Sequence, residues 1–104
     1  MIAIDIRMYE LVMLFPTLQR TPAKYFDPWD PEGFAEYWIA GSGGEKDAAL
    51  FVLSVWNPST DWSQWGLTRD GERGGFFDMH RALGNWDEQH REAFIAWARR
   101  PWWA

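Results

Sequence analysis

The two histidines of the sequence, His80 and His90, are its best candidates for acid–base or metal chemistry, because imidazole titrates near neutral pH and binds metal ions. They lie on either side of Gly84-Asn85, in two segments that we expect to be helices. Folding back at that corner would bring the two rings together, as a metal site or a pair of general bases requires. Their spacing, however, matches no HExxH or two-histidine-one-carboxylate pattern, and there is no third strong ligand. We therefore favour a half-buried helical His90, a solvated His80 and no metal site.

Other residue types that carry catalysis are scarce. The sequence has no cysteine, and only one of its four serines, Ser54, lies in an apolar run. Ser54 lacks the GxSxG turn that presents a hydrolase nucleophile. The stretch GSGGEK at 41–46 lacks the spacing and the Lys-Ser/Thr ending of a phosphate-binding P-loop. We expect no catalytic residue and no cofactor, although nothing here excludes a small enzyme.

Charge is unevenly distributed along the chain, whose formal net charge is −5. Residues 25–68 contain seven acids and a single base. A protein that binds nucleic acid directly needs a basic surface, and this distribution argues against one. The acidic middle suits a basic protein partner, or it serves solubility alone.

Tryptophan is the compositional anomaly, with nine in 104 residues, against an ordinary frequency of about one in a hundred. So small a domain cannot easily bury all of them, and two or three at the surface would form an adhesive patch. For any single tryptophan the core is the more frequent location. The tail 99–104, RRPWWA, is either an exposed binding segment or a plug that folds back onto the helices.

In the first half of the chain, residues 2–9 alternate between apolar side chains and Ala, Asp, Arg or Tyr, which predicts a short strand. Residues 11–15 break that period and are compatible with a strand or a buried helix. Residues 17–29 contain two prolines and few periodic apolar positions, so they form a connection. Asp30-Pro31 then marks a helix start, with Gly41 after its last residue.

In the middle, residues 41–44 read as a flexible glycine link, and 45–57 as a central element buried on most sides. Acids and alanines at the start of that element favour a helix, whereas its valines favour a strand; we choose the helix. Ser59 or Thr60 would cap a single turn carrying Trp62 and Trp65. Residues 66–75 form a mobile polar loop.

The C-terminal quarter predicts a helical hairpin. Residues 76–83 have apolar side chains at near-helical spacing, and Gly84 suits the end of that helix. Asp87 is a good N-cap for the next helix, whose Phe94 and Trp97 lie on one face, and Pro101 stops it.

Together these patterns predict one globular domain over residues 1–104, mainly α, with about four short helices and a short N-terminal strand, the alternative being an α+β fold. The N-terminal apolar stretch is too short and too charged to span a membrane, and it lacks the features of a signal peptide. We therefore expect a soluble cytoplasmic protein.

For function we favour a non-catalytic module that binds a larger protein with a basic surface, without contacting nucleic acid or membrane directly, as a monomer or homodimer. Small acidic domains without catalytic motifs are similar in type to phage and plasmid inhibitors of host defence, such as anti-CRISPR proteins. Two alternatives remain: an aromatic-lined ligand-binding domain or small enzyme using His80 and His90, and an accessory subunit that self-associates through the tail. The residues expected to bind the partner are Asp27, Trp29, Asp30, Glu32, Glu36, Glu45, Asp47, Trp62, Trp65, Trp102 and Trp103.

Overall fold

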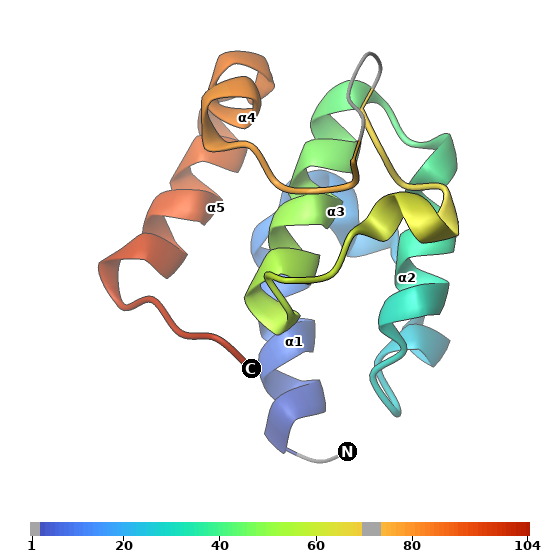
Figure 1. Cartoon of the computed structure of the whole chain (residues 1–104). Helices are drawn as coiled ribbons and strands as arrows, with labels where there is room; N and C mark the ends of the chain where they lie inside the picture. The colour runs from blue at the N-terminus through green and yellow to red at the C-terminus, as the bar shows by residue number, and fades with distance from the viewer. Residues whose placement is uncertain (1–2, 70–73) are drawn as a thin grey trace.

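The computed structural model describes residues 3–69 and 74–104, and this part of the chain forms five α-helices and four short 3-10 turns. Figure 1 shows α3 in the middle, with α2 on one side and α4 and α5 on the other. The expected mainly α class is confirmed. The elements are α1 (Ala3–Leu14), η1 (Pro16–Arg20), η2 (Ala23–Tyr25), α2 (Pro31–Tyr37), η3 (Trp38–Ala40), α3 (Gly43–Trp56), η4 (Trp62–Trp65), α4 (Met79–Asn85) and α5 (Glu88–Arg99).

The N-terminal segment is helical, so the expected short strand is wrong for the described residues, and the α+β alternative falls with it. A strand would have turned Asp5 outward and Ile6 inward, but Asp5 is buried and Ile6 is 42% exposed. Met8, Leu11 and Val12 are buried at the i, i+3, i+4 spacing of a helix. The alternation of residues 2–9 was therefore misleading, because the helical pattern of burial continues beyond it.

Helix α3 is the centre of the core, and the expectation of a helix here rather than a strand is confirmed. All of its residues from Asp47 to Leu53 are buried. Its start is fixed by a capping box: the Ser42 hydroxyl accepts the Glu45 N–H at 3.4 Å, and the Glu45 carboxylate accepts the Ser42 N–H at 2.8 Å. The flexible glycine link expected at 41–44 is therefore wrong, since Gly43 and Gly44 form the first turn of α3.

Helix α2 begins as expected, with Asp30 as N-cap and Pro31 in the first turn. The Asp30 carboxylate accepts the Gly33 N–H at 2.9 Å, and η3 carries the coil on to Ala40. Gly33 also permits a close approach, because a Cβ there would lie only 2.7 Å from the Tyr25 ring. The chain before α2 can therefore pack Tyr25 closely against this helix.

The turn that carries Trp62 and Trp65 is present, but Asp61 caps it instead of Ser59 or Thr60. Asp61 also accepts the Gly75 N–H at 2.7 Å. The loop expected at 66–75 is thus anchored at both described ends; residues 70–73 lie outside the described part. Gly66 has φ +88°, a conformation that favours glycine.

The two expected C-terminal helices are present, with different boundaries, but α4 packs against α3 more than against α5. Phe76 and Phe77 precede α4, which starts after Asp78 and runs through Gly84 to Asn85. Asp87 caps α5 as expected.

The tail folds back onto the helices. The Ala104 N–H donates to the Val55 carbonyl at 3.0 Å, and Trp97 Nε1 donates to the Trp102 carbonyl at 3.1 Å. Of the two possibilities for the tail, the folded-back one is the one observed.

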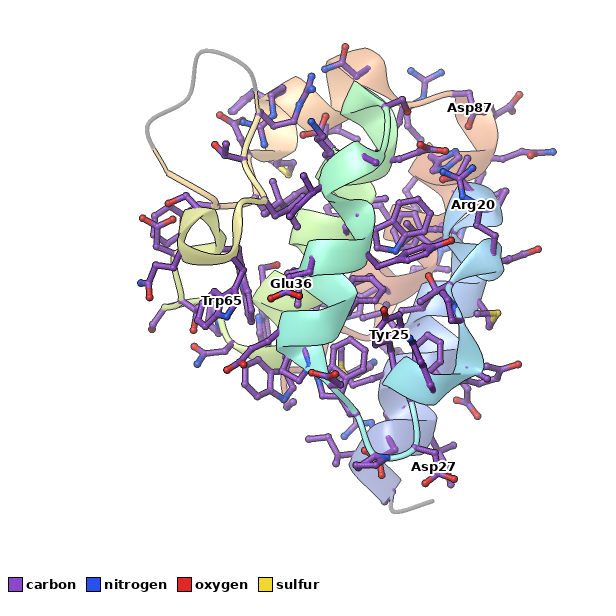
Figure 2. The ribbon with its side chains drawn as sticks, turned by 90° about the vertical axis from the view of Figure 1, so that its right-hand side faces the viewer. Arg20, Tyr25, Asp27, Glu36, Trp65 and Asp87 are labelled. Atoms are coloured by element: carbon purple, nitrogen blue, oxygen red, sulfur yellow. The ribbon has the colours of Figure 1, made fainter. Side chains whose placement is uncertain are left out.

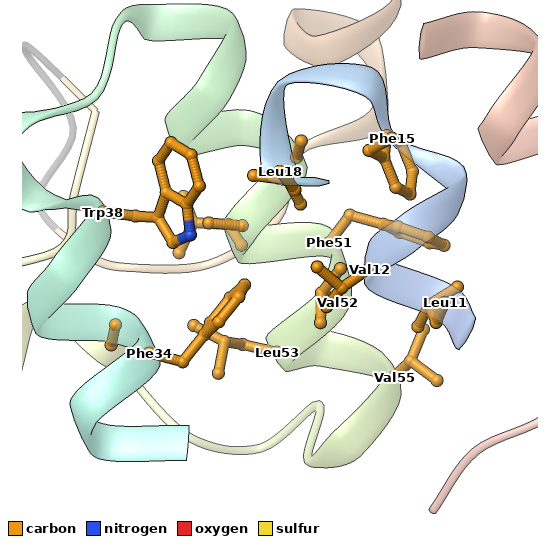
Figure 3. Packing of buried hydrophobic residues seen from close by; sticks show 14 of the residues in the cluster. Leu11, Val12, Phe15, Leu18, Phe34, Trp38, Phe51, Val52, Leu53 and Val55 are labelled. Carbon is orange, nitrogen blue, oxygen red and sulfur yellow. The ribbon is translucent and has the colours of Figure 1, made fainter. Parts of the chain in front are cut away.

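The buried apolar side chains form one contiguous cluster. Figure 3 shows side chains of α3 such as Phe51 and Leu53 lying between those of α1, among them Val12, and those of α2, among them Phe34. Because α3 supplies the middle of this cluster, it contributes little surface, and the outer sides of the helices around it are left to meet other molecules.

Candidate functional site: an acidic face beside aromatic rings

The outer side of α2 and the chain leading into it carry four exposed acids. Asp27, Glu32 and Glu36 form no ion pair or side-chain hydrogen bond within residues 3–69 and 74–104. Asp30 is exposed as well, although its carboxylate caps α2. Glu32 and Glu36 are four residues apart on the helix, so they project from the same face. The carboxylates of Asp27, Glu32 and Glu36 are therefore free to meet a partner.

Aromatic rings lie beside these carboxylates. Tyr25 rests on α2, and its ring centroid is 6.0 Å from that of Tyr37, which is 36% exposed. Trp65 is half-buried on η4, which packs against α2. Figure 2 shows Glu36 on α2 between Trp65 and Tyr25, and Asp27 beyond Tyr25 at the lower end of the view. We call this set the acidic face; its members are Asp27, Asp30, Glu32, Glu36, Tyr25, Tyr37 and Trp65.

The nearby bases do not neutralise the acidic face. The guanidinium of Arg20 pairs with Glu45 at 3.1 Å and lies over the Trp38 ring, 4.8 Å from its centroid. Lys24 Nζ lies 5.1 Å from the centroid of Tyr25, at the border of the face. This contact is a cation–π interaction, and it indicates how a ring of the face can hold a positive charge.

Glu45, expected to bind a partner, is engaged inside the protein. Burial alone would raise the pKa of its carboxyl, but the hydrogen bonds from Ser42 and the charge of Arg20 hold that pKa below its ordinary value. The carboxylate is thus committed to starting α3 and to pairing with η1.

Asp47 and Trp62 are also displaced from the expected binding set, because neither reaches the surface. Asp47 is fully buried; its Oδ1 accepts Arg81 Nε at 2.7 Å and lies 3.1 Å from Arg69 Nε. Trp62 is 2% exposed and packs under Trp65, with ring centroids 5.1 Å apart. Their inclusion in the binding surface is corrected accordingly.

Trp29 is half-buried at the lower edge of the core. Its ring stacks on Phe26 at 5.9 Å and leans on Phe34 at 5.3 Å, and its backbone N–H donates to Asp5 at 2.8 Å. Trp29 therefore holds the segment that carries Asp27 against the core, and its ring is not fully available to a partner.

The two tryptophans of the tail lie away from the acidic face. Trp102 is half-buried, with the Arg7 guanidinium 4.0 Å from its ring centroid. Trp103 is 55% exposed, and its ring meets Trp97 edge-on at 5.3 Å. Figure 1 shows that the tail ends near α1 and α3, whereas α2 lies on the other side.

The histidines are not brought together into a metal site. His80 is exposed, whereas His90 is 6% exposed. His90 Nδ1 lies 2.8 Å from Asp87 Oδ1, and its Nε2 lies 2.9 Å from Thr17 Oγ1. In the described residues no group of three or more His, Asp or Glu side chains could hold a metal ion.

The Thr17–His90–Asp87 chain has the connectivity of a hydroxyl, a base and an orienting acid. However, the Asp87 side chain is 66% exposed and also accepts the His90 backbone N–H at 2.9 Å, as the N-cap of α5. The same contacts attach η1 to the start of α5, which explains the arrangement without chemistry.

Two residues of the acidic face, Tyr25 and Tyr37, were not anticipated from the sequence. Tyr37 follows Glu36 at the end of a predicted helix, but the helical spacing alone does not show that its side chain is exposed. The position of Tyr25 has no local signal either, because it depends on how the connection packs on α2.

Compared with known proteins, the chain matches no family model, no curated protein and no solved structure. Within the described residues, no helix is both long enough and apolar enough to cross a membrane.

Proposed function

We propose that the protein is a protein-binding module whose acidic face docks on an arginine- and lysine-rich surface of a larger protein. The observation that carries this proposal is that Asp27, Glu32 and Glu36 form no ion pair within the described residues, and that Glu36 lies between the rings of Tyr25 and Trp65. Solubility requires surface charge, but it gives no reason for those charges to lie next to Tyr37 and Trp65.

The charged and the aromatic side chains would contribute to binding in different ways. Like-signed carboxylates attract a basic partner over a distance and orient it, which accelerates association at low salt. Aromatic side chains then supply contact area and cation–π interactions with arginine at short range. The acidic face has both components within one helix and its two flanking turns.

We extend the proposal to a target that itself binds nucleic acid, because the most basic protein surfaces are those that contact phosphates. The carboxylates would then occupy arginines and lysines that nucleic acid otherwise neutralises. In that case the protein acts as a small inhibitor of a nucleoprotein complex, as a counter-defence protein of a phage or plasmid would.

The test compares two double substitutions with the same change in net charge. Glu32→Gln/Glu36→Gln removes two charges from the acidic face, and Asn85→Lys/Ala98→Lys adds two positive charges at exposed positions of α4 and α5. Each protein is used to capture partners from a bacterial lysate at low and high salt, and the affinity for the purified partner is then measured. We expect the first variant to lose binding by about a hundredfold, since two contacts of about 1.4 kcal/mol each are removed, and the second to bind as the wild type does.

Equal losses in both variants would show that only overall charge matters and would contradict a defined face. Circular dichroism confirms that each variant is folded. A nucleic-acid duplex added to the complex should displace the protein from its target; simultaneous binding of both would contradict the inhibitor proposal while leaving the docking proposal intact.

A further inference from the structure

A second surface lies on the opposite side of the molecule, where a groove runs between α1 and α5. Its centre is lined by Leu14, which is 44% exposed, and by the small side chain of Ala96. Both residues line the two hollows that make up the groove, so these hollows are continuous. An exposed leucine at the centre of a groove is an apolar contact that no element of the described chain covers.

The two ends of the groove carry opposite charge. One end is lined by Arg7 and Arg100, with Glu10 beside them. The other end is lined by Glu88 and Glu92. The two arginines and the acids of the other end are exposed and form no ion pair within residues 3–69 and 74–104.

We propose that this groove binds a second copy of the same chain, related to the first by a two-fold axis that passes near Leu14 and Ala96. A two-fold axis brings each end of the groove onto the other end of its partner, so that bases meet acids twice. The two exposed leucines then cover each other, and alanine leaves room for the backbones to approach. A surface with basic and acidic ends about an apolar centre is complementary to itself.

The dipole of α5 accounts for part of this pattern, because acids suit its start and bases its end. It does not account for Arg7 or Leu14, which lie on α1, nor for an apolar centre left in solvent. Figure 1 places α5 and α2 on opposite sides of α3, so the dimer leaves both acidic faces uncovered. The inference is therefore independent of the proposed function.

The experiment measures mass in solution by light scattering over concentrations from about 1 µM to about 1 mM, because a dimer forms by mass action. We expect the mass to rise from one chain to two as concentration increases. Leu14→Asp should weaken association at least tenfold, whereas Arg91→Glu, a charge change on α5 outside the groove, should not. A wild-type protein that stays monomeric throughout, or a Leu14→Asp protein that dimerises normally, would overturn the proposal.

A second experiment reverses the charges at one end of the groove in each of two variants and then mixes them. Arg7→Glu/Arg100→Glu makes both ends of the groove acidic, and Glu88→Arg/Glu92→Arg makes both ends mainly basic, with Glu10 as the one acid left among the lining residues. Each variant alone should be monomeric, and an equimolar mixture should form a heterodimer, since acids then face bases at both ends. This recovery cannot arise from misfolding; its absence, with both variants folded by circular dichroism, would refute the two-fold arrangement.

Discussion

At the scale of single residues, Asp47 shows how far burial can change the role of a charged side chain. Its carboxylate is fully buried on α3 and holds Arg69 from the chain after η4 and Arg81 from α4. Its Oδ2 has no hydrogen-bond partner in the described residues. The free energy of this arrangement therefore depends on the two guanidinium groups staying in place.

We expect Asp47→Ala to lower the free energy of unfolding by about 3–5 kcal/mol, because it leaves two arginines close together without their counter-charge. Urea unfolding measures the loss. Replacing all three charged residues, by Asp47→Leu with Arg69→Met and Arg81→Met, should restore most of it. The matched control, Glu36→Ala on the outer side of α2, should change stability by less than about 0.5 kcal/mol. If the free energy of unfolding falls no further in Asp47→Ala than in the control, the buried carboxylate does not stabilise the fold.

The sequence could not reveal this role. Arg81 is 34 positions from Asp47, and no local pattern links residues so far apart. Trp62 and Trp65 show the same limit, since they share one turn, yet one is buried and the other half-exposed. Which tryptophan faces the core depends on where η4 packs, and composition says nothing of that.

At the scale of elements, the tail shows that neighbouring tryptophans have different energetic roles. Trp102 is half-buried between Arg7 and Trp97, whereas Trp103 is more than half exposed. The tail connects α5 to α1 and α3 through these contacts.

We expect Trp102→Ala to lower the free energy of unfolding by about 2 kcal/mol, which is below the range for a fully buried tryptophan. Trp103→Ala should lower it by less than about 1 kcal/mol, because its ring keeps much of its contact with water. Chemical denaturation of the two variants side by side gives both values. Equal effects, or a larger effect at Trp103, would show that the tail packs differently.

Elements with signals at their ends were predictable from the sequence. Asp30-Pro31 and Asp87 both start helices where expected, because capping is a local interaction between near neighbours. The capping box of Ser42 and Glu45 carries the same kind of signal, but the four-residue glycine-rich stretch concealed it. At the start of the chain, by contrast, residues 1–4 include none of the residue types that commonly cap a helix, so no local signal opposed the strand-like alternation.

At the scale of the whole molecule, three carboxylates at the starts of helical turns make stability depend on pH. Hydrogen bonds from the backbone N–H groups of Gly75, Arg81 and His90 hold the pKa values of Asp61, Asp78 and Asp87, respectively, below their ordinary value. The unfolded chain lacks these bonds, so it takes up protons at higher pH than the folded protein does.

We therefore expect this contribution to stability to be complete above pH of about 4, the ordinary aspartate value. It should be lost as the pH falls through the lowered values. Thermal unfolding from neutral pH to about pH 2 measures the loss. A variant with asparagine at all three positions, which can still cap, should lose less stability over the same range. Parallel curves for the two proteins would contradict this assignment.

The acidic face was predictable only in part. Its acids could be found from charge alone, since 25–68 is the acidic part of the chain. Which of those acids point outward depends on the packing of α2 and α3, and that packing removes Glu45 and Asp47 from the surface. The mainly α class could be predicted because several segments each showed helical spacing or a helix start. For residues 45–57, by contrast, periodicity could not distinguish a helix from a strand.

The burial of α3 also has a consequence for how this sequence can change over generations. Substitutions from Asp47 to Leu53 disturb packing on several sides at once, so the requirement to fold leaves little freedom there. The outer side of α2 is less restrained, because Glu32 and Glu36 are exposed and form no ion pair or side-chain hydrogen bond within the described residues. In a library selected for folding alone, these two positions should accept almost any residue. Under selection for the biological activity as well, any restriction found there would come from the molecule that they meet.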